Sequence, residues 1–138
     1  MPNKVQWDAR HSTGSEAVDD RYQSILARCN AMADCLDRGG IESNRLFDEM
    51  LHSLLAHARQ HFAWEEAMLE IGDSPELENQ RRDQEEFDFL TAEIVTIENF
   101  DRAELHTFLS LWWNGYIIGS ANNFRTLFER RLAPAGAT

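Results

Sequence analysis

The chain has 138 residues, 43% of them hydrophobic, and a formal net charge of -11 at pH 7. This length is typical of one domain with a substantial core, and the apolar content argues against a disordered chain. The negative charge argues against binding to nucleic acid or to an anionic membrane, because both require clustered Lys and Arg. No stretch reaches the roughly 18 apolar residues of a membrane span, so none is predicted.

The cysteines and the N-terminus indicate the compartment. Cys29 and Cys35 lie six residues apart, a spacing that matches no zinc or redox motif. The first ten residues are polar and carry no apolar signal core. We therefore expect two reduced thiols in a cytoplasmic protein.

The first half of the chain predicts two long helices. Residues 18–38 carry apolar side chains at every third or fourth position, and Gly39 and Gly40 provide the helix stop. The second helix is predicted over residues 44–71, with Ser43 as its N-cap.

The second half predicts two more helices. Ser74 and Pro75 have the pattern of an N-cap followed by proline, and the helix that they begin extends to about Asn99. The fourth helix is predicted to end at about Leu132. At its start, Asp101 and Glu104 have the spacing of a capping box, although the first residue is not Ser or Thr.

Four helices joined by short connections predict an all-α, antiparallel up-down-up-down four-helix bundle. We expect one domain over residues 1–138, with the bundle at 18–132 and a tail at 133–138. Residues 1–17, which include Trp7, are expected to form an N-terminal loop across one end of the bundle.

Each predicted inward face carries polar residues where an ordinary bundle has Leu or Ile. They are Tyr22 in the first helix, His61 and Glu65 in the second, Gln80 and Gln84 in the third, and Tyr116 in the fourth. A buried polar group is costly without a partner. We therefore expect one shared site that holds a metal, a ligand, waters or a closed hydrogen-bond network.

His61 and Glu65, one helical turn apart on the same face, resemble the second-helix motif of the hemerythrins, the di-iron four-helix proteins that bind oxygen. The resemblance extends over the chain to the bacterial single-domain members. It is carried, in the family's order, by the Trp7 loop, Gly14 to Asp20, the His61 to Leu69 block, Ser74-Pro75-Glu76-Leu77 and Trp112-Trp113.

The resemblance implies a di-iron site of five histidines and two bridging carboxylates, of which this chain keeps His61 and Glu65. The remaining ligand positions fall on Tyr22, Gln80, Gln84, Tyr116 and Ala121. One carboxylate and one imidazole do not balance the charge of two iron ions. We therefore expect no di-iron centre and no ordinary oxygen carriage.

The replacing Tyr and Gln side chains keep hydrogen-bonding atoms, which favours a metal-free polar network. Without an enzyme motif elsewhere, the sequence predicts a non-catalytic degenerate hemerythrin that serves as a binding, sensory or interaction module. The alternative is a metalloprotein with one iron or zinc ion at His57, His61 and Glu65, with Tyr22 or Tyr116 as a phenolate, that binds oxygen or nitric oxide.

The fourth helix offers a further hypothesis. Trp112-Trp113 and Ile117-Ile118 place apolar groups on more than one of its faces. An exposed apolar area signals an interface, so Trp113 and Ile117 are candidates for a homo-oligomer or partner surface. The alternative is that these apolar groups belong to the core, with ordinary partial exposure.

Overall fold

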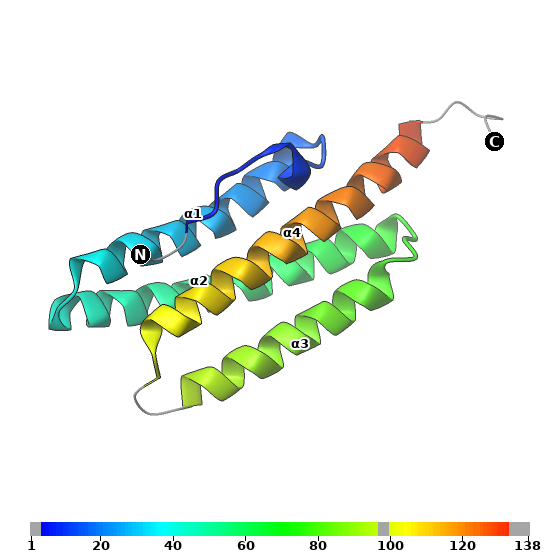
Figure 1. Cartoon of the computed structure of the whole chain (residues 1–138). Coiled ribbons are helices and arrows are strands. Elements are labelled where there is room, and N and C mark those ends of the chain that lie inside the picture. The colour runs from blue at the N-terminus through cyan, green and yellow to red at the C-terminus, as the bar shows by residue number, and fades with distance from the viewer. Residues whose placement is uncertain (1–3, 97–99, 133–138) are drawn as a thin grey trace.

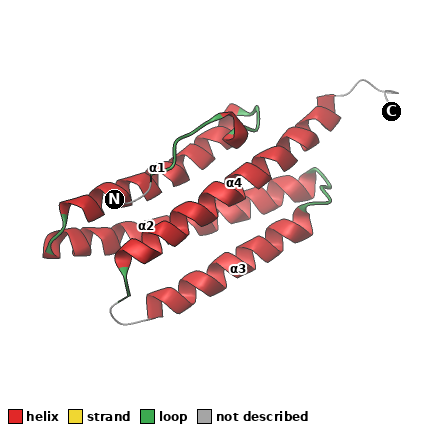
Figure 2. Ribbon diagram, in the orientation of Figure 1, coloured by secondary structure: helices red, strands yellow, loops and turns green. Residues whose placement is uncertain are grey.

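A computed structural model describes residues 4–96 and 100–132 of the chain. It shows the predicted all-α architecture, an antiparallel four-helix bundle (Figure 1). The elements are the short helix η1 (Ala9–His11), α1 (Glu16–Arg38), α2 (Ile41–Ile71), α3 (Leu77–Thr96) and α4 (Arg102–Leu132). Within the described residues, loops form the N-terminal segment and short connections between helices (Figure 2).

The helix starts differ from the prediction. Gly39 and Gly40 have φ angles of 67° and 92°, a region that glycine enters without strain, so α1 and α2 are joined by these two residues alone. The α2 helix therefore begins at Ile41, and the prediction of Ser43 as an N-cap is wrong because that residue lies within the first turn.

The other predicted ends compare as follows. Helix α1 begins at Glu16, two residues before the predicted start. The predicted end of the third helix at Asn99 lies outside the described residues. The Asp101 carboxylate accepts a hydrogen bond from the Glu104 N–H at 3.0 Å, which confirms the capping role predicted for it.

The core lies mainly between α1, α2 and α4. Ile25, Leu54 and Leu109, one from each of these helices, are fully buried. Burial of each such side chain contributes about 1.5–3 kcal/mol. Helix α3 contributes Phe87 to this core and packs chiefly against α2.

The N-terminal segment runs lengthwise over α1 and α4, so the prediction that it crosses one end of the bundle is wrong (Figure 1). Val5 exchanges two hydrogen bonds of 2.9 Å with the side chain of Asn30 in α1. The His11 Nε2 lies 2.7 Å from Asn114 Oδ1 in α4. Asn30 and Asn114 thus fix the segment along the groove that these two helices form.

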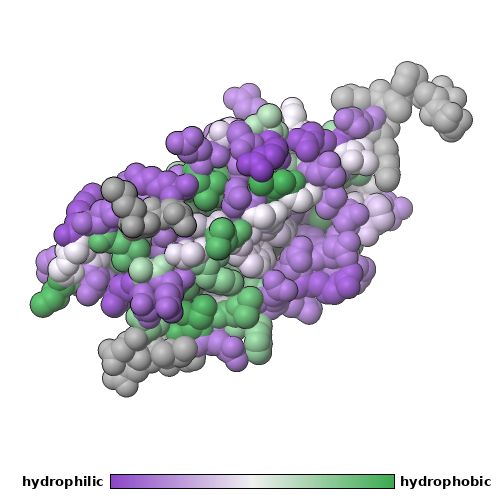
Figure 3. Space-filling view, viewed as in Figure 1, coloured by the Kyte–Doolittle hydropathy of each residue, from purple (hydrophilic) through white to green (hydrophobic). Residues whose placement is uncertain are grey.

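Trp113 and Ile117 are both 0% exposed, so the partner surface predicted through them is wrong. The reason is that α4 is covered on several sides, and the Trp113 ring packs on Phe62 of α2 and Phe87 of α3. The surface in view in Figure 3 is mostly hydrophilic, with scattered apolar groups. Within the described part of the chain, no helix combines the length and apolar character required to cross a membrane.

Candidate functional site

The helical spacing of His61 and Glu65 brings their side chains together inside the bundle. Each residue is 1% exposed, and the His61 Nε2 lies 2.6 Å from Glu65 Oε2. A buried carboxylate needs partners because burial removes it from water. The structure supplies these partners from two further helices.

Hydroxyl groups from α1 and α4 donate to both oxygens of Glu65. Tyr116 Oη and Ser120 Oγ of α4 lie 2.5 and 2.9 Å from Oε1. Tyr22 Oη of α1 lies 3.3 Å from Oε2 and 2.7 Å from Ser120 Oγ. We call Tyr22, His61, Glu65, Tyr116 and Ser120 the Glu65 cluster.

The electrostatics keep both phenols of the cluster protonated. Burial, followed by the negative charge of Glu65, raises the pKa of Tyr22 and of Tyr116 well above the usual range. The two hydroxyls therefore remain hydrogen-bond donors at neutral pH. The His61 Nε2 lies within hydrogen-bond distance of Glu65 Oε2, while the buried Nδ1 has no partner among the described residues.

Aromatic rings surround the cluster. The His61 ring centroid lies 5.1 Å from that of Tyr22 and 6.1 Å from that of Trp113. Trp112 and Tyr116 stack with their planes 8° apart and their centroids 5.0 Å apart. Such apolar walls lower the local dielectric and strengthen the hydrogen bonds to the carboxylate.

The predicted glutamines do not join these hydrogen bonds. Gln80 is 4% exposed, but its Nε2 donates to the Phe62 carbonyl at 3.2 Å and its Oε1 has no partner. Gln84 is half-buried and lies outside the contacts to Glu65. Ala121 is fully buried and offers no donor atom. Because α3 packs on α2, the Gln80 amide reaches the α2 backbone rather than the carboxylate.

Ser120 is the member of the cluster that the sequence analysis missed. It follows Tyr116 by four residues and therefore lies on the same face of α4. This spacing is a signal that places Ser120 beside Tyr116, whereas the resemblance to the hemerythrins implies a ligand position at the neighbouring Ala121. The structure instead gives Ser120 the role of bridging Tyr22 and Glu65.

His57 lies on the outer side of α2, where its Nε2 is 3.5 Å from Ser24 Oγ. Burial is the largest of the effects that lower its pKa. Among the described residues, no three His, Cys, Asp or Glu side chains are grouped closely enough to hold a metal ion. The structure therefore does not gather His57, His61 and Glu65 into one ligand set.

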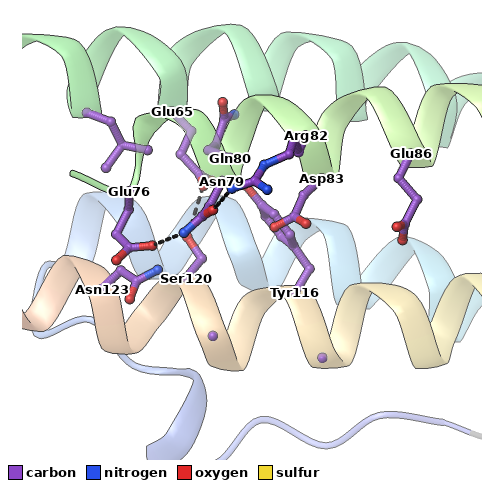
Figure 4. A pocket seen from close by; sticks show the side chains of 13 residues that line it. Glu65, Glu76, Asn79, Gln80, Arg82, Asp83, Glu86, Tyr116, Ser120 and Asn123 are labelled. Carbon is purple, nitrogen blue, oxygen red and sulfur yellow. Dashed lines mark hydrogen bonds between the residues drawn. The ribbon is translucent and has the colours of Figure 1, made fainter. Parts of the chain in front are cut away.

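A cavity of about 520 Å³ opens onto the cluster between α3 and α4 (Figure 4). Its wall includes Glu65, Tyr116 and Ser120 of the cluster. A Cβ atom added at Gly115 or Gly119 would meet nothing within 4 Å, so these glycines leave room along α4.

The rim of this cleft is polar, and half of its residues are acidic. It is lined by Glu76, Asn79, Arg82, Asp83, Glu86 and Asn123. Burial, followed by the charge of Glu86, raises the pKa of Asp83. The buried carboxylate of Glu65 therefore lies next to a polar cleft.

Comparison of the chain with protein-family models, curated proteins and solved structures gives no match. The resemblance to the hemerythrins therefore rests on the residues of the chain itself. Its main support is the pair of His61 and Glu65 one turn apart in the second helix of an antiparallel four-helix bundle.

Proposed function

We propose that this protein is a non-catalytic, hemerythrin-like binding, sensory or interaction module of the bacterial cytoplasm. In this proposal the Glu65 cluster replaces a di-iron centre, and the cleft beside it admits a small polar ligand. The observation that carries the proposal is the Glu65 carboxylate, each oxygen of which accepts two side-chain hydrogen bonds.

The chemistry of the side chains at the former ligand positions supports a site without two iron ions. The lone pairs of Glu65 are engaged by four donors, and both phenols are held in the protonated form. The Gln80 amide is engaged with the α2 backbone, and Ala121 has no ligand atom. A pair of iron ions would need several of these positions to supply anionic or imidazole donors.

The cleft supports a role in binding. Tyr116 and Ser120 belong both to the cluster and to the cleft wall, so a ligand there meets hydroxyls that already donate to Glu65. A polar ligand would exchange hydrogen bonds with them, and a satisfied network of this kind rigidifies the core. Binding would thus be transmitted to α1 and α2 through Tyr22 and His61.

Elemental analysis tests the metal-free part of the proposal. Protein expressed in iron-rich medium is expected to contain far less than one metal ion per chain, and a chelator is expected to leave the melting temperature unchanged. Metal bound only to the native state would add stability that the chelator removes. Close to one iron or zinc ion per chain would overturn the proposal.

A thermal-shift screen of small polar compounds tests the cleft. Gly119→Leu should fill it and abolish the stabilisation given by any compound that binds there, since a side chain at this position has free space. Ala103→Leu, at an exposed position of α4 outside the cleft, is the matched control and should retain the response. Equal responses in both variants would exclude the cleft as the binding site.

The second candidate function is a mononuclear metalloprotein that binds oxygen or nitric oxide. The observation in its favour is that the imidazole of His61, the carboxylate of Glu65 and the phenols of Tyr22 and Tyr116 meet at one point. A ferric ion bound to a phenolate would give a visible charge-transfer band that Tyr116→Phe or Tyr22→Phe alters. Iron-loaded protein without such a band would contradict this version of the site.

A further inference from the structure

The outer seam between α1 and α2 carries a second group of polar side chains, separate from the Glu65 cluster. Three contacts cross the seam in succession: Arg21 Cζ lies 4.1 Å from the Trp64 ring centroid, Ser24 Oγ lies 3.5 Å from His57 Nε2, and Arg28 Nη1 donates to Ser53 Oγ at 2.9 Å. Except for the exposed Ser53, these side chains are half-buried. We call this group the basic seam.

Among the residues that the structure describes, the arginines of the basic seam have no acidic partner, although the chain has 24 acidic and only 13 basic residues. Elsewhere in the described chain, Arg10, Arg45, Arg81 and Arg102 form ion pairs with carboxylates. Of the described arginines without an ion pair, Arg38, Arg59 and Arg82 are exposed to solvent, and Arg125 donates to backbone carbonyls. Neither Arg21 nor Arg28 has one within ion-pair distance in that part of the chain. In addition, the Arg28 Nε is buried without a hydrogen-bond acceptor.

The positive charges of both guanidinium groups affect the same residue, His57. Besides burial, the charges of Arg28 and Arg21 lower the pKa of His57, which lies between them along the seam. Grouped cations repel one another, and among the described residues no carboxylate lies within ion-pair distance of either arginine to offset that repulsion. An anion from outside the chain would offset it.

We propose that the basic seam binds a small soluble anion that bears phosphate groups, through the guanidinium groups of Arg21 and Arg28. The planar guanidinium presents paired N–H donors that match two phosphate oxygens. The Trp64 ring restrains Arg21, and the hydroxyls of Ser24 and Ser53 add donors next to the two arginines.

The spacing selects the class of anion. Arg21 and Arg28 are seven residues apart, which corresponds to roughly 10 Å along the helix axis. A diphosphate spans more of that distance than a single phosphate does. The overall charge of -11 repels extended polyanions and anionic membranes, and this favours a small ligand.

Titration with inorganic pyrophosphate at constant ionic strength tests the proposal, by calorimetry and by NMR of the arginine Nε–Hε groups. We expect saturable binding of one pyrophosphate per chain, with shifts at Arg21 and Arg28. Arg21→Gln and Arg28→Gln should each weaken binding by about tenfold, as loss of a charge-assisted hydrogen bond does. Arg21→Lys, which keeps the charge but loses the planar fork, should also weaken it.

Arg38→Gln is the matched control, because it removes the same charge from an exposed position of α1 outside the seam. It should change the affinity for pyrophosphate by less than about twofold, as expected for a distant, screened charge. Circular dichroism of each variant establishes that the fold is retained.

Absence of saturable pyrophosphate binding would overturn the proposal. An equal loss of affinity in Arg38→Gln and Arg28→Gln would do the same, because it would indicate a diffuse charge effect. The last measurement is binding of the protein to vesicles that contain a lipid with a phosphorylated headgroup. Binding to these vesicles without binding to free pyrophosphate would contradict a small soluble ligand.

Discussion

Two buried polar centres in this bundle solve the same problem in different ways. The Glu65 carboxylate recruits four donors from α1, α2 and α4. His106, also 1% exposed, lies elsewhere in the core, where its Nε2 is 3.0 Å from the Cys29 carbonyl oxygen and 3.2 Å from Ser110 Oγ. Burial is the main effect on His106 and lowers its pKa, which favours the neutral imidazole.

The difference shows that a buried charged group requires more hydrogen-bond partners than a buried neutral one. A carboxylate remains ionised in the core only if several donors replace its water shell. A neutral imidazole needs far less: one backbone carbonyl and one hydroxyl of its own helix contact the His106 Nε2, and the buried Nδ1 has no partner among the described residues. The Glu65 cluster should therefore dominate the polar contribution to stability.

The largest expected effect is that of Glu65→Ala. The change leaves Tyr22, His61, Tyr116 and Ser120 without their shared acceptor, and it should lower the free energy of unfolding by about 3–5 kcal/mol. His106→Ala should cost less, because fewer polar groups lose a partner. Urea denaturation of both variants measures the difference. A loss for Glu65→Ala no larger than that for His106→Ala would contradict the comparison.

The next largest effect separates the two phenols. Tyr116→Phe should lower the free energy of unfolding by about 1.5–3 kcal/mol, as expected for one hydrogen bond to a charged group. Tyr22→Phe should cost less, since its hydroxyl is 3.3 Å from Glu65 and shares Ser120. The same urea experiment orders the two, and the reverse order would show that Tyr22 is the main donor.

The alkaline range tests the raised pKa values of the phenols. Tyr22 and Tyr116 are the only tyrosines of the chain, so absorbance at the tyrosinate band reports on them alone. In the unfolded state they ionise near pH 10. In the folded state their pKa values are higher, so stability should fall as the pH rises above about 10. Tyrosinate formation near pH 10 in folded protein would contradict this burial.

The acid range tests the other centre. The lowered pKa of His106 means that the unfolded state takes up a proton near pH 6.5 while the folded state does not. Stability should therefore fall as the pH decreases below about 6.5. His106→Gln should reduce this dependence, and the remainder reflects His57, whose pKa is lowered in the same direction. His52→Gln, at an exposed position, should not change it.

The smallest expected effect is the chemical modification of the Cys29 thiol. Burial raises the pKa of Cys29 to about 12, so very little thiolate is present at neutral pH. A disulfide reagent should modify Cys29 only as fast as the protein unfolds. Faster modification would show that the core around Cys29 and His106 opens locally, and this part of the core would then be less stable than the Glu65 cluster.

The sequence by itself determined the helices and the pair at the centre of the bundle. Helical periodicity places His61 and Glu65 on one buried face whatever the neighbouring helices do, because the spacing of i and i+4 is a local property. The inward positions of Tyr22 and Tyr116 followed from the same periodicity. The glycine pair after α1 also marked the first turn, although the start of α2 was placed three residues late.

Only the tertiary structure decided which of these polar residues meet. Ser120 joins the Glu65 cluster while Gln84 does not, because the way α3 packs relative to α2 and α4 is set by side chains far apart in the sequence. The course of the N-terminal segment and the burial of Trp113 and Ile117 were decided in the same way. Periodicity indicates that a side chain faces inward, but its partner depends on the level and rotation at which the helices pack.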